Sequence, residues 1–431
     1  MQSCGAGAAL RAQRRQRPNL VVILVDDIGR DWVGCYGARQ RTPNIDKLAR
    51  DGVRFDKAWS TPICTPTRVE LLTGRYPFRT GWIDHFDVPR WGGKGLDWDR
   101  EITFARMLRD AGYATVIGGK WQVNDFRTHP DALKRHGFDE HCMWTGFETG
   151  NPPSARRYWD AFLQINGERR VHSGKYGPDV VNAYLVDFVR RNRQKPFLLY
   201  YPMILVHGAY EPTPWNRSDP PKGNAALYSG MVSYADHLVG NIMQSLDEAG
   251  VARDTFVLFA GDNGSPMGGG SINGLVCPPG KGRITDLGAH VPFIARAPWL
   301  GTRGRVATEL ADFSDVLPTL AELAGIAAPC GVAIDGRSFV PVLTGASGGT
   351  RREWIYTQRW NKRAVRDARY KVNSDGSFFD LEQDPLEKND LRSSTDSGVA
   401  AARRRLEAVL QKFPENGPPP FEGYAAGKLG G

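Results

Sequence analysis

The segment from Ser60 to Pro77 places an arginine four residues after a cysteine, at the start of a predicted helix. Pro66 suits the first turn of a helix, where a missing N–H costs nothing, and Gly74 is a typical helix end. Cys64 is therefore predicted to lie just before the helix N-terminus, where free N–H groups and the helix dipole favour an anion. Arg68, about one turn further on, adds a positive charge. The segment predicts an anion-binding cysteine site or, as the simpler alternative, a buried cysteine at a loop–helix junction.

Two pairs of oxygen-bearing side chains directly follow apolar runs, which are typical of buried parallel strands. Ligand sites in open α/β sheets gather at the carboxyl ends of such strands. Oxygen ligands without His or Cys suit a hard cation, with calcium expected first and magnesium as the alternative. Each pair is also a common turn former after a strand, but two such pairs favour a metal site. The four residues are Asp26, Asp27, Asp262 and Asn263.

Four cationic or titratable side chains could stabilise an anion at the same site. His207 follows an apolar run and Lys281 lies in a glycine-rich loop, so each alone is more often structural or solvated. Taken together they form a set that could balance the charge of a transferring group. The set is Arg68, Lys120, His207 and Lys281.

The order of these groups resembles that of the type I sulfatases, in which a maturation enzyme oxidises a cysteine to formylglycine. Cys64-Thr-Pro66-Thr-Arg68 and Leu71-Leu-Thr-Gly-Arg75 resemble the two halves of the family signature, of which the enzyme reads the cysteine, the proline and the arginine. The resemblance extends over about residues 18 to 395. Its other landmarks are Asp26-Asp27, Thr42-Pro-Asn-Ile-Asp46, Gly119-Lys120-Trp121, Gly137-Phe-Asp-Glu140, His207 with Glu211-Pro212, Asp262-Asn263-Gly264, Gly280-Lys281-Gly282 and Phe379-Asp-Leu-Glu-Gln-Asp-Pro385.

The resemblance implies a sulfuric ester hydrolase in which a hydrated formylglycine at position 64, held on the metal, attacks sulfur. It implies that Arg68, Lys120 and Lys281 balance charge on the sulfate, and that His207 or Lys281 protonates the leaving alcohol. Position 64 then also counts among the metal ligands. The second hydroxyl loses its proton, sulfate leaves, and the aldehyde returns.

Two segments depart from the family pattern. Gln122 stands where the family usually has a histidine, and the segment Asp286 to His290 stands where Glu-Gly-Gly and an arginine are usual. An amide can donate a hydrogen bond but cannot accept a proton at neutral pH. We therefore expect sulfate expulsion to be slow, and Gln122→His to raise the steady rate, unless a neighbouring group takes the proton.

Two other functions share this pattern. A phosphodiesterase or phosphonate hydrolase of the same superfamily would use the same fold and metal. A non-catalytic protein that binds sulfated glycans is suggested by Gln122, although the cations and metal ligands are all present. A sulfated carbohydrate is preferred over a simple aryl sulfate as substrate. Aromatic side chains could stack on sugar rings or simply pack, and the candidates are Trp82, Trp91, Trp98, Trp144, Trp159 and Trp215.

Strands alternating with helices predict an α/β fold with parallel crossovers. Strands are expected at 19–25, 112–117, 196–201, 255–260 and 291–295, and the main helices at 42–51, 103–111, 180–193, 226–248 and 312–323. The resemblance implies an alkaline-phosphatase-like sulfatase sandwich with a mostly parallel central sheet. Short strands at 354–360, 363–371 and 378–381 and a helix at 399–413 predict a small antiparallel α+β subdomain. The expected division is a basic arm at 1–18, a catalytic domain at 19–345 and a C-terminal subdomain and tail at 346–431.

The chain has 431 residues and a formal charge of +9, which fits either a solvated basic surface or a preference for anionic substrates. No Lys/Arg cluster interleaved with aromatic residues suggests nucleic acid, and no apolar run reaches transmembrane length. In the first 18 residues the arginines follow a short apolar segment, the reverse of a signal peptide. The family resemblance nevertheless favours a periplasmic or secreted protein.

Overall fold

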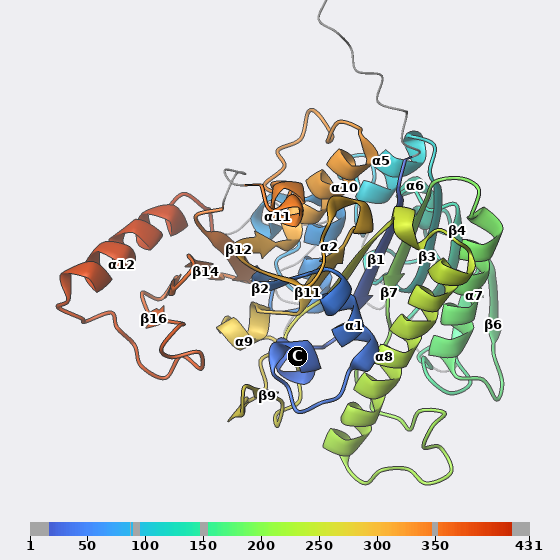
Figure 1. Ribbon diagram of the computed structural model, residues 1–431, viewed down its shortest axis with the longest axis horizontal. Helices are drawn as coiled ribbons and strands as arrows, with labels where there is room; N and C mark the ends of the chain where they lie inside the picture. The colour runs from blue at the N-terminus through green and yellow to red at the C-terminus, as the bar shows by residue number, and fades with distance from the viewer. Residues whose placement is uncertain (1–16, 87, 89–94, 147–153, 347–351, 416–431) are drawn as a thin grey trace, which may run out of the picture.

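The computed structural model describes residues 17–86, 88, 95–146, 154–346 and 352–415. Its centre is a ten-stranded sheet, with helices on both faces (Figure 1). The five strands β8, β1, β7, β3 and β4 are mutually parallel, while β11 and β5 run antiparallel to their neighbours. The strand order is β12 (Arg305–Asp312), β2 (Val53–Trp59), β11 (Phe293–Arg296), β8 (Thr255–Gly261), β1 (Asn19–Val25), β7 (Phe197–Pro202), β3 (Ala114–Lys120), β4 (Glu140–Trp144), β5 (Phe162–Ile165) and β6 (Glu168–Val171).

Strand β1 is apolar over six of its seven residues because both of its faces are covered. Leu20, Val22 and Leu24 pack in one core, with α2 (Cys64–Thr73), α5 (Phe104–Asp110) and α10 (Val316–Ala324). The alternate residues Val21 and Ile23 pack in the other core, with α1 (Pro43–Asp51), α7 (Gly177–Asn192) and α8 (Asn224–Glu248). The predicted α/β sandwich with a mostly parallel sheet is confirmed.

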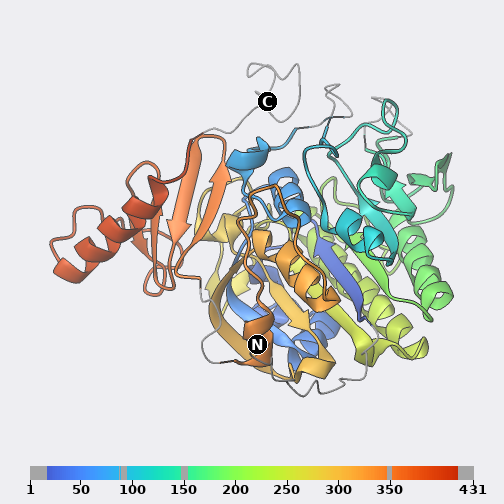
Figure 2. The same cartoon turned by 90° about the horizontal axis from the view of Figure 1, so that it is seen from above.

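A second, antiparallel sheet lies to one side of the first, and α12 (Ser397–Leu410) packs on it (Figures 1 and 2). Its strands are β13 (Ile355–Arg359), β14 (Lys362–Arg366), β15 (Tyr370–Asn373) and β16 (Phe378–Asp380). The small C-terminal antiparallel unit is therefore confirmed, although the predicted strand 363–371 is two strands. The division of the chain at residue 345 stays a prediction, and residues 1–16, 347–351 and 416–431 lie outside the described residues.

The remaining elements are short. They are α3 (Pro77–Thr80), α6 (Ala132–Arg135), α9 (Asp286–Ala289), α11 (Val340–Thr344), the hairpin β9 (Ser271–Ile272) and β10 (Leu275–Val276), and the 3-10 turns Arg30–Trp32, Gly34–Tyr36, Ala252–Asp254, Pro298–Leu300 and Phe313–Asp315. None of the helices in the described part of the chain is long and apolar enough to cross a membrane.

The sequence missed five strands of the ten-stranded sheet and misjudged one direction. The missed strands are β2, β4, β5, β6 and β12, several of which alternate or are polar: β2 reads VRFDKAW and β6 reads ERRV. The predicted strand 291–295 exists as β11 but is antiparallel. The predicted helix 312–323 begins later, since Arg305–Asp312 is strand β12 and α10 starts at Val316.

Gly119 is the penultimate residue of β3, directly before Lys120, and its backbone conformation is constrained. Its φ is +126°, and a Cβ atom there would lie 1.9 Å from the carbonyl oxygen of Pro202. Gly112, two residues before the same strand begins, has a φ of +92° but no atom of the described residues within 4 Å of a Cβ position. Gly119 therefore carries a steric constraint in addition to a backbone one.

We expect Gly119→Ala to destabilise the protein more than Gly112→Ala does. The control variant bears only the backbone strain of about 1–3 kcal/mol, whereas Gly119→Ala adds an overpacking cost of about 1–3 kcal/mol or more. Thermal unfolding of both variants measures the difference. Equal losses of stability would contradict the steric role of this position.

Candidate active site

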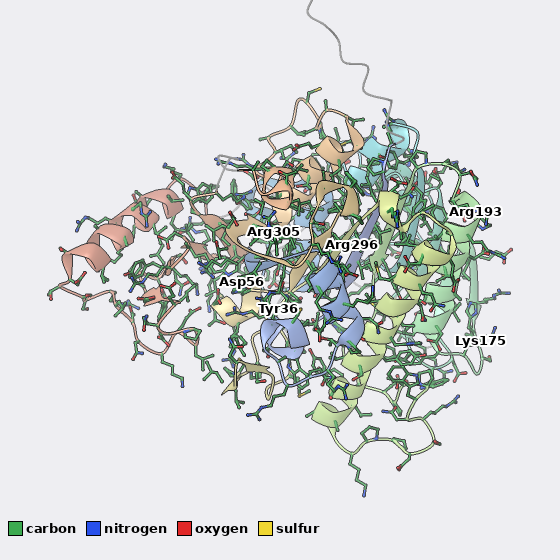
Figure 3. All side chains as sticks on the ribbon, in the orientation of Figure 1. Tyr36, Asp56, Lys175, Arg193, Arg296 and Arg305 are labelled. Carbon is green, nitrogen blue, oxygen red and sulfur yellow. The ribbon has the colours of Figure 1, made fainter. Side chains whose placement is uncertain are left out.

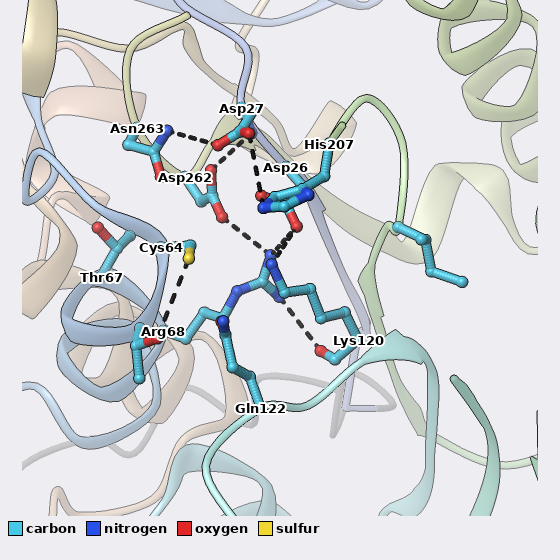
Figure 4. Close-up of polar contacts among 12 residues, drawn as sticks. Asp26, Asp27, Cys64, Thr67, Arg68, Lys120, Gln122, His207, Asp262 and Asn263 are labelled. Atoms are coloured by element: carbon cyan, nitrogen blue, oxygen red, sulfur yellow. Dashed lines mark hydrogen bonds and ion pairs between the residues drawn. The ribbon is translucent and has the colours of Figure 1, made fainter. Parts of the chain in front are cut away.

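The predicted site residues meet at the carboxyl ends of the central strands, where the ends of parallel strands share one edge of a sheet (Figure 4). Strand β1 delivers Asp26 and Asp27, β8 delivers Asp262 and Asn263, and β3 ends in Lys120. The loop after β2 leads into α2, which begins at Cys64 itself rather than one residue later, and which ends at Gly74 in the left-handed conformation. Pro66 lies in its first turn, as predicted.

The acidic and amide side chains form one buried cluster. The backbone N–H of Asp27 donates to Oδ1 of Asp262 at 2.8 Å, and Nδ2 of Asn263 donates to Oδ1 of Asp27 at 2.9 Å. Asp27 has a φ of +61°, an uncommon conformation for a non-glycine residue. Oδ1 of Asp26 and Oδ1 of Asn263 are buried and have no hydrogen-bond partner among the described residues. Unpaired buried oxygens need a ligand that accepts their lone pairs.

This cluster fits a hard divalent cation. Asp26, Cys64 and Asp262 each offer one ligand atom within 4.8 Å of the others, and all three are buried. The pKa of Asp262 is raised well above its usual value by burial and by the neighbouring Asp26 carboxylate. A divalent cation between these groups would remove that repulsion, and an oxygen-rich donor set is what calcium and magnesium prefer.

Two buried cations face the same carboxylates. Nζ of Lys120 lies 2.6 Å from Oδ2 of Asp26, and Nη2 of Arg68 lies 2.9 Å from Oδ2 of Asp262 and 3.3 Å from Oδ2 of Asp26. Burial alone would raise the pKa of Asp26, but the charges of Lys120 and Arg68 outweigh it and hold that pKa below its usual value. Arg68 also donates from Nη1 to the carbonyl of Lys120, so the two cations are positioned together.

Lys281 and His207 approach from the side of Asp27. Nζ of Lys281 lies 2.6 Å from Oδ2 of Asp27, and Nε2 of His207 lies 3.9 Å from the same oxygen. Burial would lower the pKa of Lys281, but Asp27 raises it, so this lysine is charged. Burial, followed by the charge of Lys120, lowers the pKa of His207 to about 4. Nδ1 of His207 lies 2.9 Å from Nη1 of Arg157, which can only donate, and 2.5 Å from the carbonyl oxygen of Gly208, which can only accept. The ring proton is therefore on Nε2 when Arg157 donates to Nδ1, and on Nδ1 when Nδ1 donates to Gly208.

Gln122 lies next to the site with a φ of +76°. Its Nε2 lies 2.9 Å from Nδ1 of His85, and the same ring nitrogen lies 2.8 Å from the hydroxyl of Thr65. Sγ of Cys64 lies 4.0 Å from that hydroxyl, and Cys64 is a free thiol.

All the predicted site residues are thus brought together, while their roles stay predictions. Sequence reasoning missed Arg157 and His85 as neighbours of the site. Arg157 had no signal, because it lies 50 residues before its partner His207 in an irregular loop. His85 had a weak one, since it is a histidine in the segment that follows the Cys64 helix.

The tryptophans are mostly core residues, which is the simpler of the two alternatives. Trp82 and Trp144 are buried, Trp98 is partly buried against a core, and Trp91 lies outside the described residues. Trp215 is 59% exposed, and Trp159 is half-buried beneath Arg217, whose guanidinium lies 3.6 Å from the ring centroid.

A cavity of about 530 Å³ lies apart from this cluster, on the side of the C-terminal sheet. Tyr36 and Asp56, both labelled in Figure 3, line it together with Arg366 of β14. None of the predicted site residues lines it. Its wall includes Asp286, which accepts hydrogen bonds from the indole of Trp59 at 2.8 Å and from Arg366 at 3.0 Å. The segment that departs from the family pattern therefore joins the two sheets.

Known proteins are similar to this chain in sequence and in fold. A family model described as Sulfatase matches residues 18–326. Steryl-sulfatase of Mus musculus is 31% identical, with 79% of this chain and 67% of that protein covered. N-acetylgalactosamine-6-sulfatase of Canis lupus familiaris is also 31% identical, with 86% and 74% covered. The crystal structure of Ps i-CgsB in complex with k-i-k-neocarrahexaose has a TM-score of 0.79 and 26% identity, with 96% of each chain covered.

We expect calcium, and more weakly magnesium, to raise the thermal unfolding midpoint of the protein, because a ligand of the native state stabilises it. Asp262→Asn keeps the size of the side chain but removes a charge from the cluster, so this shift should disappear. Asp236→Asn is a matched control, since Asp236 is equally buried but accepts from the backbone of Asn44 and Ile45. An unchanged calcium response in Asp262→Asn would place the cation elsewhere.

Proposed function

The chain belongs to the sulfatase family, and we propose that it hydrolyses a sulfate monoester with a formylglycine made from Cys64 and one bound divalent cation. One observation supports this proposal most: a buried carboxylate cluster, two buried cations and the first residue of α2 lie together at one edge of the sheet. Calcium is our first choice of cation, with magnesium as the alternative, and Asp26, Asp27, Asp262, Asn263 and position 64 would hold it.

The cation and the formylglycine would each supply defined chemistry. A hard divalent cation lowers the pKa of a bound hydroxyl and offsets negative charge on a transferring group. A formylglycine in its hydrated form offers one hydroxyl as nucleophile and a second that lets the aldehyde return. Position 64 suits this role because it begins α2, where free backbone N–H groups favour negative charge.

The chain's own cations hold the sulfate group. Arg68 and Lys120 are almost fully buried, so their charges act in a low-dielectric environment and are worth more than in water. Both are fixed on carboxylates before substrate arrives, so little reorganisation is needed. Lys281, paired with Asp27, adds a third charge to the cluster.

Two groups are placed to protonate the leaving alcohol. Lys281 holds a proton because Asp27 raises its pKa. His207 is neutral near pH 7. In the tautomer in which Arg157 donates to Nδ1, its Nε2–H can donate toward a leaving oxygen, whereas a hydrogen bond from Nδ1 to the carbonyl of Gly208 leaves Nε2 unprotonated. Both side chains are partly exposed, at 20% and 28%, as a group that meets substrate must be.

A sulfated carbohydrate is the substrate class that we propose. Ps i-CgsB was solved with a bound k-i-k-neocarrahexaose, and N-acetylgalactosamine-6-sulfatase is named for a sulfated sugar. In this chain the side of the site near His207 carries arginines on aromatic rings. Arg157 lies 4.3 Å from the Trp144 ring centroid, and Arg217 covers Trp159. Because each ring face is covered, the guanidinium groups rather than the rings are available to bind an anionic substituent of a sugar.

The proposal includes a partner and a location. A formylglycine-generating maturation enzyme must act on Cys64 before the chain folds around it, because Cys64 is only 3% exposed in the folded protein. We also propose a periplasmic or secreted location, following the family resemblance, and cell fractionation tests it.

Mass spectrometry of the peptide containing Cys64 tests the nucleophile. After co-expression with a maturation enzyme, the peptide should carry the aldehyde, and aryl sulfate turnover should rise with the modified fraction. Cys64→Ala should abolish turnover while the protein stays folded. Full activity with an unmodified thiol would contradict the proposal. Faster turnover of an aryl phosphodiester than of the aryl sulfate would instead assign a phosphodiesterase.

Substrates with different leaving groups test the proton donor. His207→Ala and Lys281→Ala should each be compared on an activated aryl sulfate and on a sulfated saccharide. The true donor should lose on the order of 100-fold or more with the saccharide and much less with the aryl sulfate, because a good leaving group needs no proton. An equal loss on both substrates would show that the residue only binds sulfate. The same saccharide panel identifies the preferred substrate.

A further inference from the structure

Two contacts connect position 64 to a histidine that has no assigned role, and a third joins that histidine to Gln122. Sγ of Cys64 lies 4.0 Å from the hydroxyl of Thr65, and that hydroxyl lies 2.8 Å from Nδ1 of His85. Nε2 of Gln122 lies 2.9 Å from the same nitrogen. Thr65 is fully buried, so its hydroxyl is held between position 64 and the imidazole.

The donor and acceptor roles in these hydrogen bonds follow from the chemistry of the groups. The nitrogen of a glutamine amide can only donate, so Nδ1 of His85 accepts and the ring proton is on Nε2. The Nδ1 lone pair therefore faces Thr65 and Gln122. A ring nitrogen in this state can take up a proton, whereas an Nδ1–H could not.

Gln122 can serve both protonation states of the ring. Its Oε1 is buried and has no hydrogen-bond partner among the described residues. When Nδ1 gains a proton, rotation of the amide replaces Nε2 by Oε1 and gives Nδ1–H an acceptor. Gln122 is also held at a φ of +76°, a strained conformation that persists only where the surroundings fix it.

We propose that His85 is the terminal proton acceptor for position 64, acting through the hydroxyl of Thr65, and that Gln122 is the residue that positions its imidazole. This inference rests on the proposed function. As sulfate leaves, the hydroxyl at position 64 passes its proton to Thr65 Oγ1, and Thr65 passes its own proton to Nδ1 of His85. The electron pair of the broken O–H bond forms the aldehyde C=O, and sulfate departs with the pair of the broken C–O bond. The imidazolium later returns the proton to solvent.

This assignment changes the expectation for Gln122. The sequence predicts slow sulfate expulsion unless a neighbour takes the proton, and His85 is that neighbour. Gln122→His should therefore not raise the steady rate, because it removes the amide that positions His85.

Burst kinetics on an activated aryl sulfate test the proposal. His85→Asn keeps an acceptor near the Nδ1 position but cannot take up a proton. We expect the first release of phenol to stay within about threefold of wild type and the steady rate to fall about 100-fold or more. Thr65→Val should behave in the same way and Thr65→Ser should recover most of the rate. A steady rate within threefold of wild type in His85→Asn, or an equal loss in both phases, would overturn the proposal.

A second histidine–glutamine pair provides the matched control. His141 of β4 lies 3.3 Å from Nε2 of Gln164, outside the site. His141→Asn should leave both kinetic phases unchanged. A loss in His141→Asn equal to that in His85→Asn would overturn the assignment, because any part-buried histidine would then suffice.

A measurement without turnover separates this proposal from the proposed function. In Cys64→Ala protein with ¹⁵N-labelled histidine, NMR should show His85 with an unprotonated Nδ1, and Gln122→Ala should perturb that signal. A proton on Nδ1 would overturn the relay. If wild type carries no aldehyde and hydrolyses no sulfate ester, the proposed function fails, while this NMR result still decides the hydrogen-bond assignment.

Discussion

The structure depends on a set of charges buried where the central strands end. Asp26, Arg68 and Lys120 are 0%, 1% and 3% exposed, so none of them is solvated by water. Removing one partner from such a cluster leaves an uncompensated buried charge and typically costs about 3–5 kcal/mol. The protein is therefore less stable whenever one partner of this charge cluster is missing. The same low dielectric that makes the cluster costly makes its charges strong toward a sulfate group.

Topology makes the cluster possible with few long loops. Because β1, β8 and β3 are parallel, their carboxyl ends lie at the same edge of the sheet. The polar residues follow each strand directly, so no long loop is needed to bring them together. Cys64 arrives by a different route, since β2 also runs toward this edge and its following loop enters α2 directly. Asp27 and Gln122 both take left-handed backbone conformations at strand ends. Strain of this kind is concentrated at the site, where tight turns must aim side chains inward.

Sequence reasoning succeeded where chemistry and burial leave a strong local pattern. Apolar runs such as Asn19–Val25 predicted buried strands, and paired carboxylates after them predicted the cluster. It failed at β2 and β6, because strands that are buried on one face only, or that lie at a sheet edge, carry polar residues and do not form a continuous apolar run. It could not predict that β11 runs antiparallel, since direction depends on partners far along the chain. The contact between His85 and Gln122 was equally hidden, because 37 residues separate them.

The C-terminal sheet also helps to shape the site, through Arg359 at the end of β13. Its Nη1 donates to the carbonyl of Gly282 at 2.5 Å, and its Nε donates to Asp84 at 3.1 Å. One side chain thus holds the residue after Lys281 and the residue before His85. The N–H of Gly282 in turn donates to the carbonyl of Pro62, in the loop that leads into Cys64. The position of Lys281 and of His85 relative to Cys64 is therefore set by a segment outside the central sheet. A sequence that kept every motif of the large sheet but lost this arginine would keep its metal ligands. It would lose the contacts that hold the loop of Lys281 against the loop of His85.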